Sequence, residues 1–498
     1  MAVESLSDTL WDVVICGTGL SQSLLALSLS RSGKNILHID PNEYYGGAEA
    51  AFSLQEAEKW AASVSTPEAQ APSLFKSASI TKPENVEDLS FPRAYSLALA
   101  PQLIYARSEL LSQLVSSRAY RQVDFLAVGS FFIVKSPSAP SEPRTLVRIP
   151  STREDVFSTS AISVKAKRGL MKFLKFVVDF DNPENSEKWK PHAQNPLFEF
   201  LQDQFKMDTE LQTYIITLTL SLDGRIETKE GLAIIHRHLS SMGVYGPGFA
   251  AIYPKWGGIS EIAQVSCRAG AVGGAVYMLG TGIKGTSAAD DGMELELTSG
   301  DKVKTRMLVR GYEDGTRDAG ISRLVAVIGS PLKFLFEAVV EGAPIPGVAI
   351  VAFPAGSLTT AAGNASASPV YVFAHSSDTG ECPTGQSVLY LTAPATPDSK
   401  ELLDKALEFF LSSVGETPVP QSLYHVYYEQ YAGMTPPASG TDDLAISFPA
   451  PSFSLSFDDT TLDPVRGVWK RVMGETAIET DYMAFPDREG AADDDIYD

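Results

Sequence analysis

The sequence predicts an α/β protein that carries a smaller all-helical domain as an insertion. Residues 11–47 have the pattern of a strand, a glycine-rich turn, a helix and a second strand, which is how a βαβ unit begins. Residues 151–222 change to a helical pattern, and strand-like runs resume after them. We therefore expect a large α/β domain from residues 1–150 and 223–485, a helical domain from 151–222, and a disordered acidic tail from 486–498.

The first βαβ unit contains most of a dinucleotide-binding fingerprint. A short apolar run precedes Gly17 and Gly19, which permit a tight turn and the close approach of a ligand. Asp40 ends the second strand about 20 residues later, where an acid would bind a ribose. The third glycine position holds Gln22, whose long side chain either crowds a pyrophosphate or points elsewhere. The residues therefore predict the unit but leave its ligand open.

The other elements follow from the spacing of apolar residues. One helix is expected over 54–63 and another within 100–117, where one face would collect Leu103, Ala106, Leu110 and Leu114. Strands are expected at 125–134 and 145–150, on either side of a turn rich in Pro and Ser. After the insertion, helices are expected at 231–243, 257–271 and 400–414, and strands at 274–279, 324–329, 348–353, 369–374 and 387–393.

The insertion has its own helix signals. Ser151 or Thr152 is a candidate N-cap, because acidic residues follow in what would be the first turn. Residues 167–180 and 195–205 are amphipathic at helical spacing. Residues 208–222 are apolar and rich in β-branched side chains, so their assignment as a helix rests on context.

Composition excludes several classes of function. The formal net charge of −21 argues against binding to a nucleic-acid backbone. The three cysteines stand apart, and no histidines have the spacing of metal ligands. The chain contains no phosphate-binding loop and no nucleophile elbow. Its start has no signal-peptide pattern, and no apolar run has the length of a membrane span. We therefore expect no metal, no catalytic residue and a cytoplasmic location.

Two stretches have the character of recognition surfaces. Residues 41–47 read PNEYYGG, and place two tyrosines and two glycines directly after the second strand. On a helix, Glu261, Gln264 and Arg268 would share one face, and on the following strand Val276 and Met278 would share one side. A charged helix face beside an apolar strand suits a protein partner. On residues alone, a solvated helix beside a core strand is the more frequent explanation.

The chain resembles the superfamily of Rab GDP-dissociation inhibitors and Rab escort proteins. The matching motifs are GTGL, LHID and YYGG near the start, and they continue through STREDVF, LMKFLKF and YPKWGGISEIAQVSCRAGAVGGAVYML. The resemblance is ordered and covers most of residues 11–280. It implies a flavoprotein-like large domain of the FAD/NAD-binding Rossmann type that works without a flavin. Gly17, Gly19 and Asp40 would then be a vestigial motif, and no cofactor is expected.

The resemblance also implies a function and a set of partners. STREDVF and LMKFLKFVVDF favour the escort group, which binds newly made GDP-bound Rab GTPases and presents them to Rab geranylgeranyl transferase. Escort proteins are not catalytic, contact the transferase α-subunit and touch membranes transiently. A Rab GDP-dissociation inhibitor is the alternative within the superfamily, and a flavin-dependent oxidoreductase is the alternative outside it.

Residues carry over from the family position by position. The Rab-binding surface would consist of Tyr45, Glu261, Arg268, Val276 and Met278. In the helical domain, Phe173 and Phe176 would include an exposed aromatic contact for the transferase. A groove for the geranylgeranyl lipid would be lined by Leu170, Leu174 and Val177, although ordinary core packing explains these three equally well.

Overall fold

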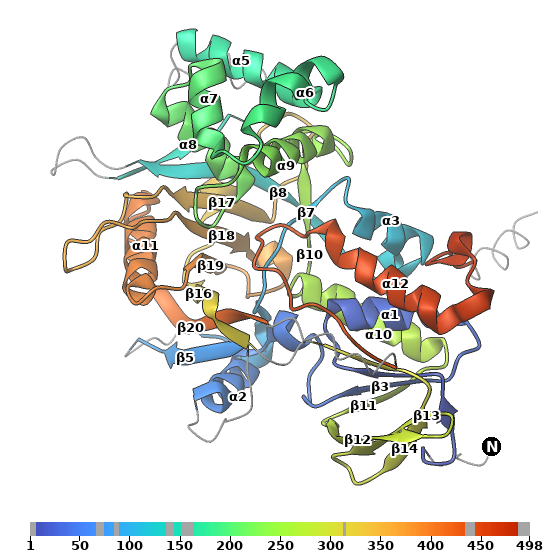
Figure 1. The fold of residues 1–498 in the computed structure, drawn as a ribbon. Helices are drawn as coiled ribbons and strands as arrows, with labels where there is room; N and C mark the ends of the chain where they lie inside the picture. Colours follow the sequence, from blue (N-terminus) through green and yellow to red (C-terminus); the bar gives the residue numbers. More distant parts are fainter. Residues whose placement is uncertain are drawn as a thin grey trace, which may run out of the picture.

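A computed structural model describes residues 6–65, 74–83, 89–135, 144–150, 164–311, 315–433 and 444–486. Two large sheets and a group of helices are arranged side by side (Figure 1). The candidate cap at Ser151 or Thr152 lies outside the described residues, as does the expected acidic tail from residue 487 onward.

A parallel five-stranded sheet forms around the βαβ unit. The strands, in spatial order, are β11 (Val276–Leu279), β3 (Ile36–Asp40), β2 (Val13–Cys16), β15 (Leu308–Arg310) and β21 (Ala445–Ser447). β2 and β3 are buried on both faces, which is why they are almost wholly apolar in sequence. One face packs on α1 (Leu20–Leu29), α10 (Ile259–Val272) and α12 (Leu462–Met473). β11 is an edge strand, so its side chains are more exposed.

A small four-stranded sheet covers the other face of the parallel sheet. It contains β1 (Leu10–Trp11), β14 (Lys302–Thr305), β13 (Gly292–Leu297) and β12 (Ile283–Ala289). In β13 and β14, buried and exposed residues alternate, as expected of strands with one solvated face. The buried side chains of β13 pack against Val14, Leu37 and Ile39 of the parallel sheet.

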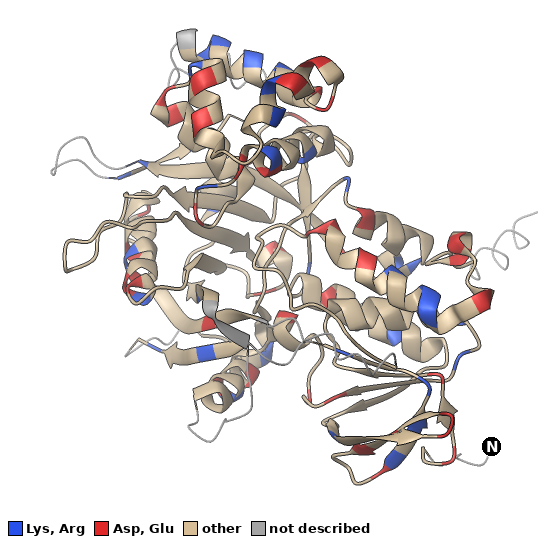
Figure 2. Cartoon of the chain, in the orientation of Figure 1, with Lys and Arg blue, Asp and Glu red and all other residues tan. Residues whose placement is uncertain are grey.

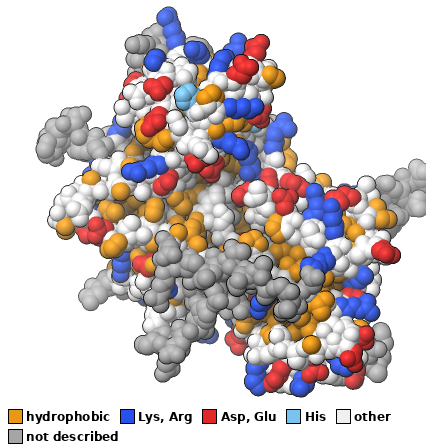
Figure 3. All heavy atoms as spheres, in the orientation of Figure 1, with side chains coloured by type: hydrophobic (Ala, Val, Ile, Leu, Met, Phe, Trp, Pro, Cys, Tyr) orange, Lys and Arg blue, Asp and Glu red, His pale blue; other side chains and the backbone are white. Residues whose placement is uncertain are grey.

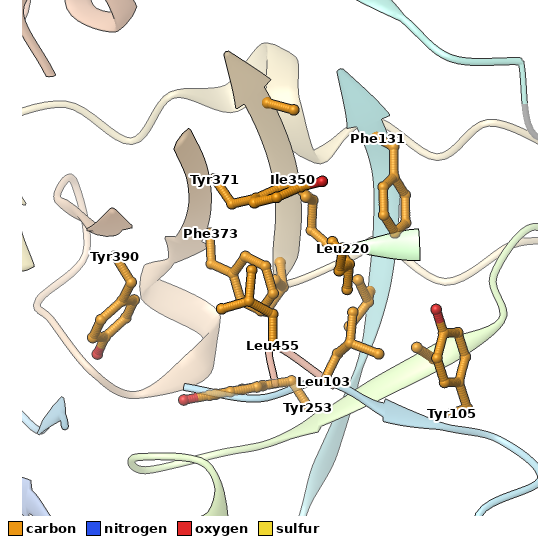
Figure 4. Packing of buried hydrophobic residues seen from close by; sticks show 14 of the residues in the cluster. Leu103, Tyr105, Phe131, Leu220, Tyr253, Ile350, Tyr371, Phe373, Tyr390 and Leu455 are labelled. Carbon is orange, nitrogen blue, oxygen red and sulfur yellow. The ribbon is translucent and has the colours of Figure 1, made fainter. Parts of the chain in front are cut away.

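The second large sheet has ten strands and mixed direction. Its main path is β5 (Phe75–Thr81), β20 (Ser422–Gly433), β16 (Gly315–Ile328), β19 (Ser387–Pro394), β18 (Val370–Ser376), β17 (Val348–Phe353), β8 (Phe125–Lys135), β10 (Ala251–Pro254) and β7 (Ile104–Tyr105), and β9 (Thr145–Arg148) pairs with β8. α11 (Ser399–Ser413) packs on one face. On the other face, α2 (Leu54–Ser65) lies against β5, near the short pair β4 (Ala51–Phe52) and β6 (Leu97–Ala98). Figure 4 shows tyrosines, phenylalanines and leucines that form the hydrophobic core on this face of the ten-stranded sheet. They come from β8, β10 and β18 among others.

The helical layer stands beside β8 at the top of Figure 1. Its helices are α5 (Val164–Val178), α6 (Pro183–Trp189), α7 (Leu197–Phe205), α8 (Thr209–Thr219) and α9 (Thr228–Ser241). α5, α7 and α8 all contact α9, whose Leu232 and Ile235 are fully buried in their shared core. The packing therefore continues past residue 222, where we expected the helical domain to end. The helix expected within residues 208–222 is α8, and it begins after Asp208, whose side chain accepts a hydrogen bond from the Leu211 N–H.

The expected helix within 100–117 is wrong in its first half. Ile104 and Tyr105 form β7, which pairs with β10, so Leu103 and Ala106 belong to extended chain. The helix is α3 (Glu109–Ser116), which begins after Ser108 because the Ser108 side chain accepts a hydrogen bond from the Leu110 N–H. Leu103 and Ala106 are apolar because they are buried in extended chain beside β7, and their helical spacing with Leu110 is a coincidence. The other expected strands and helices within the described residues are confirmed.

Candidate functional site

Gln22 lies across the glycine-rich turn at the start of α1. A Cβ added to Gly19 would lie 3.1 Å from Gln22 Oε1, and one added to Gly311 would lie 2.3 Å from Gln22 Nε2. Gly17 has a φ of 97°, so the turn retains the left-handed backbone that needs glycine. Gln22 therefore crowds the turn itself, and it lines a cavity of about 1300 Å³ together with Gly17, Thr18, Asp40 and Glu49.

Asp40 is fully engaged with donors of the chain itself. Its Oδ2 accepts from the Thr18 N–H at 2.7 Å and from the Thr18 hydroxyl at 2.6 Å. Its Oδ1 accepts from the Asn42 N–H at 2.8 Å and from Asn42 Nδ2 at 2.9 Å. Burial raises the pKa of Asp40, and these hydrogen bonds oppose the rise. A ribose hydroxyl would have to displace them.

Glu49 lies at the N-terminus of α1, where a pyrophosphate binds in a dinucleotide fold. Its Oε2 accepts from the Leu20 N–H at 2.7 Å and would lie 3.3 Å from a Cβ on Gly19. Removal from water raises the pKa of Glu49 to about 7. A carboxylate at this position repels a phosphate and uses the N–H that would bind it. Together with Gln22 and Asp40, Glu49 makes the residues of this site a poor fit for a flavin or nicotinamide dinucleotide.

The loop that follows β3 brings Tyr45 to α10. Tyr45 is half-buried, and its phenol lies close enough to Cys267 of α10 for their ionisations to interact. A Cβ on Gly46 would lie 3.3 Å from Ser260 Oγ of α10, and one on Gly270 of α10 would lie 2.5 Å from the Tyr277 hydroxyl of β11, so the loop and the strand both lie against this helix. The preceding Tyr44 points inward, with its ring 4.8 Å from that of Phe52 in an edge-on contact.

The five residues expected to bind a Rab GTPase come from these three segments. Arg268 is exposed on α10, while Glu261 is half-buried and close enough for the charge of Arg268 to affect it. Burial raises the pKa of Glu261, and Arg268 opposes that rise. Val276 is exposed on β11, and Met278 is half-buried. We call Tyr45, Glu261, Arg268, Val276 and Met278 the α10–β11 surface.

Val276 and Met278 do not share the face of α10. Met278 packs toward the small sheet, whereas Tyr277 between them packs toward α1 and α10. Met278 thus lies on the face of the sheet that α10 does not cover, and β11 is the edge strand of that sheet. The role of these five residues in binding stays a prediction.

An apolar cavity of about 650 Å³ lies between the helical layer and β8. Leu170 and Leu174 of α5 line it, as expected, together with Phe131, Tyr214, Ile215, Leu218, Leu239 and Met242. Val177 does not line it, because that side chain is fully buried in the helical core. Met171 and Val178 of the same helix line the cavity instead. Hydrophobic side chains are exposed between the helical layer and the sheet below it in Figure 3.

Phe173 and Phe176 are not exposed, so the expected aromatic contact for a transferase is wrong for both. Phe173 has no exposed area and Phe176 has 7%. Phe173 packs on Phe205, with ring centroids 5.2 Å apart, and Phe176 packs on Phe200 and Phe205. Residues three apart on α5 do share a face, and that face is the one that α7 covers.

Sequence reasoning missed Glu49, Met171 and Val178. The only signal for Glu49 was its position two residues after the YYGG motif, and nothing there indicated a hydrogen bond to Leu20. Met171 and Val178 were missed because helical spacing does not show how far around α5 the cavity lining extends beyond Leu170 and Leu174. Within the described ranges, no group of three or more His, Cys, Asp or Glu side chains could hold a metal. Likewise, no helix there has the length and apolar content needed to cross a bilayer.

A family model described as "GDP dissociation inhibitor" matches residues 7–333. The chain belongs to the GDP dissociation inhibitor family. Among curated relatives, the "Rab proteins geranylgeranyltransferase component A" of Saccharomyces cerevisiae is 29% identical over 414 residues, 80% of this chain and 64% of the relative. That of Candida albicans is 29% identical over 394 residues, 76% of this chain and 58% of the relative. The chain thus matches about three fifths of the length of these two relatives.

Other comparisons cover nearly the whole chain. The "Rab GDP-dissociation inhibitor" of Pyricularia oryzae is 24% identical over 487 residues, 93% of this chain and 95% of the relative. A crystal structure of Rab GDI from Plasmodium falciparum superposes with a TM-score of 0.66 at 17% identity, over 93% of this chain and 98% of that one. An oxidoreductase from Methanosarcina mazei superposes with a TM-score of 0.56 at 12% identity, over 92% and 99%. The expected flavoprotein-like fold class is therefore confirmed.

Proposed function

We propose that this chain is a Rab escort protein, a non-catalytic component that binds GDP-bound Rab GTPases, presents them to Rab geranylgeranyl transferase and shields the lipid that is attached. Membership of the family and the names of the fungal relatives support this proposal. The observation that carries it is the apolar cavity beside β8.

The cavity suits an isoprenoid chain. Its volume lies in the range that encloses most of a drug-sized ligand, and its lining is mainly aliphatic and aromatic. Burying a C20 lipid gains about 0.8 kcal/mol for each CH₂ removed from water, which stabilises a lipidated protein in solution without any chemistry. The exposed side chains of Lys172 and Lys175 on α5 also line the cavity, and Figure 2 shows basic positions along this helix.

The α10–β11 surface suits a globular protein partner. Arg268 offers charge-assisted hydrogen bonds to a carboxylate, and Tyr45 offers a rigid aromatic contact beside it. Val276 adds exposed apolar area at the edge of β11. The partner bound here would be the folded GTPase, and its prenylated end would lie in the cavity. Binding to the transferase α-subunit, a cytoplasmic location and transient membrane contact form part of the same proposal.

A Rab GDP-dissociation inhibitor is the second candidate. The burial of Phe173 and Phe176 favours it, because the aromatic contact that would distinguish an escort protein is absent from those two positions. Both candidates bind Rab and its lipid. They differ in whether the protein promotes lipid transfer.

A reconstitution separates the two candidates. Purified Rab, Rab geranylgeranyl transferase and geranylgeranyl diphosphate are combined with and without this protein, and lipid transfer to Rab is followed. If the protein is an escort protein, lipid transfer to Rab occurs only when the protein is present. Arg268→Ala then lowers the rate of transfer, whereas the exposed control Arg93→Ala does not. Extraction of prenylated Rab from vesicles without any promotion of transfer would assign the chain to the inhibitors. If the protein neither promotes lipid transfer nor extracts prenylated Rab, the proposal is overturned.

A further inference from the structure

The loop that carries Tyr45 is hydrogen-bonded to the glycine-rich turn. The Gly46 N–H donates to the Thr18 hydroxyl oxygen at 3.0 Å and lies 3.2 Å from the Thr18 carbonyl oxygen. Gly46 has a φ of 96°, and a Cβ there would lie 2.9 Å from Ala50 Cα and 3.3 Å from Ser260 Oγ at the start of α10. The residue after Tyr45 is therefore held between the turn and the helix that completes the α10–β11 surface.

Asp40 connects the two ends of the same loop. It accepts from both the N–H and the hydroxyl of Thr18, which in turn holds Gly46 near the end of the loop. It also accepts from the backbone and side chain of Asn42, at the start of the loop. The Thr18 hydroxyl, fully buried, donates to Asp40 and accepts from Gly46, so both of its hydrogen-bonding roles are used.

A second connection fixes the chain just beyond the loop. The Glu49 carboxylate accepts from the Leu20 N–H at the first turn of α1, and this helix packs closely on α10. Such a carboxylate serves as an internal anion for the positive end of the helix. Thr18, Asp40 and Glu49 occupy the positions that a ribose and a pyrophosphate would contact, and all three hold the loop instead.

We propose that the emptied dinucleotide site has become the support of the partner-binding loop, with Thr18 and Asp40 as positioning residues that hold Tyr45 in the α10–β11 surface. The inference rests on the proposed binding of a GTPase to that surface. It assigns a task to two buried polar residues that line the cavity beside the glycine-rich turn. Pre-organising a loop in its bound conformation strengthens binding because less freedom is lost on association.

The test is a double-mutant cycle on affinity for GDP-bound Rab. Thr18→Val removes the hydroxyl at nearly constant volume and is expected to weaken binding about tenfold, the scale of one lost buried hydrogen bond. Thr18→Ser keeps the hydroxyl and is expected to bind within about twofold of wild type. In the Tyr45→Ala background, Thr18→Val should add almost nothing, because its effect passes through Tyr45. Thr305→Val is the matched control, since it removes another fully buried hydroxyl, in the small sheet, and should leave affinity unchanged.

The outcomes distinguish this inference from the proposed function. If Tyr45→Ala binds Rab as tightly as wild type, the α10–β11 surface itself is refuted and the inference falls with it. If Tyr45→Ala weakens binding but Thr18→Val does not, or if their effects add, the positioning role is refuted and the surface stands. A thermal melt checks folding. If Thr18→Val unfolds, Asn42→Ala replaces it in the same cycle, because it removes only the 2.9 Å side-chain bond to Asp40.

Discussion

Glu49 accepts a hydrogen bond from the backbone N–H of Leu20 at 2.7 Å, across 29 residues of sequence. This contact puts a carboxyl group, half-buried and poorly hydrated, at the positive end of α1. The pKa of Glu49 is raised from 4.5 to about 7 by the removal of water. The loss of hydration outweighs the favourable helix terminus, so ionisation of Glu49 in the folded protein affects how stability depends on pH.

Glu49 is expected to make the protein less stable as pH rises. Its folded pKa lies above its unfolded value, so its contribution is fully present below pH 4.5 and is lost as pH rises through about 7. At about 1.4 kcal/mol per pKa unit, the loss is at most about 3.5 kcal/mol. Glu49→Gln should flatten this part of the profile, measured by urea unfolding between pH 5 and pH 8. Exposed Glu43→Gln in the same loop is the control, and parallel profiles for Glu49→Gln and wild type would contradict the prediction.

His38 is expected to act with the opposite sign. Burial lowers the pKa of His38 from 6.5 to about 4, and its Nε2 lies 2.7 Å from the Gly17 carbonyl oxygen. Its contribution is therefore present above pH 6.5 and is lost as pH falls through about 4. His38→Asn should lower stability at neutral pH and show a shallower loss of stability between pH 6.5 and pH 4. The control is half-buried His192→Asn, and an unchanged acid slope in His38→Asn would count against this assignment.

Phe173 and Phe176 should matter for folding rather than for recognition. Truncating either to Ala leaves a cavity against Phe205 and is expected to cost about 3–5 kcal/mol of unfolding free energy. Val178→Ala, on the same helix but 55% exposed, should change stability by less than about 0.5 kcal/mol. Denaturant unfolding of the three variants is the measurement. A small effect at both phenylalanines would show that α7 does not cover this face in solution.

Leu174 should control the capacity of the cavity for lipid. Leu174→Trp places an indole in the wall of the 650 Å³ cavity and is expected to weaken binding of a fluorescent geranylgeranyl analogue at least about tenfold, because several CH₂ groups then stay in water. Val272→Trp, at a position that is 76% exposed and outside the cavity lining, is the matched control. Equal lipid affinity in both variants would place the lipid elsewhere.

The glycine-rich turn should not take up flavin. Gln22 crowds the turn, and the Asp40 and Glu49 carboxyl groups already accept hydrogen bonds from the chain, so the purified protein is expected to show no visible flavin absorbance and no rise in Tm on addition of FAD. Unfolding in the presence of excess FAD measures the second point. A stoichiometric absorbance band or a concentration-dependent rise in Tm would overturn this conclusion about the site.

The interior of the fold could be predicted from sequence because its signals are local. The apolar run of β2, the glycines that follow it and the periodicity of α10 and α11 each lie within a few residues of one another. The same holds for the face that groups Glu261 with Arg268. The local signal was misleading at Leu103 and Ala106, before α3. These two residues have helical spacing in the sequence, but they are apolar because they are buried in extended chain.

The sequence by itself determined the βαβ start, the helical layer and the side chains available for recognition, since these depend on periodicity and residue type. Only the tertiary structure decided what those side chains face. Phe173 and Phe176 point inward because α7 covers their side of α5. Val178, and not the expected Val177, lines the cavity. The tertiary structure also brought Glu49 to Leu20 and Tyr45 to α10. Contacts between residues far apart in the chain depend on how elements pack, and no local pattern records that.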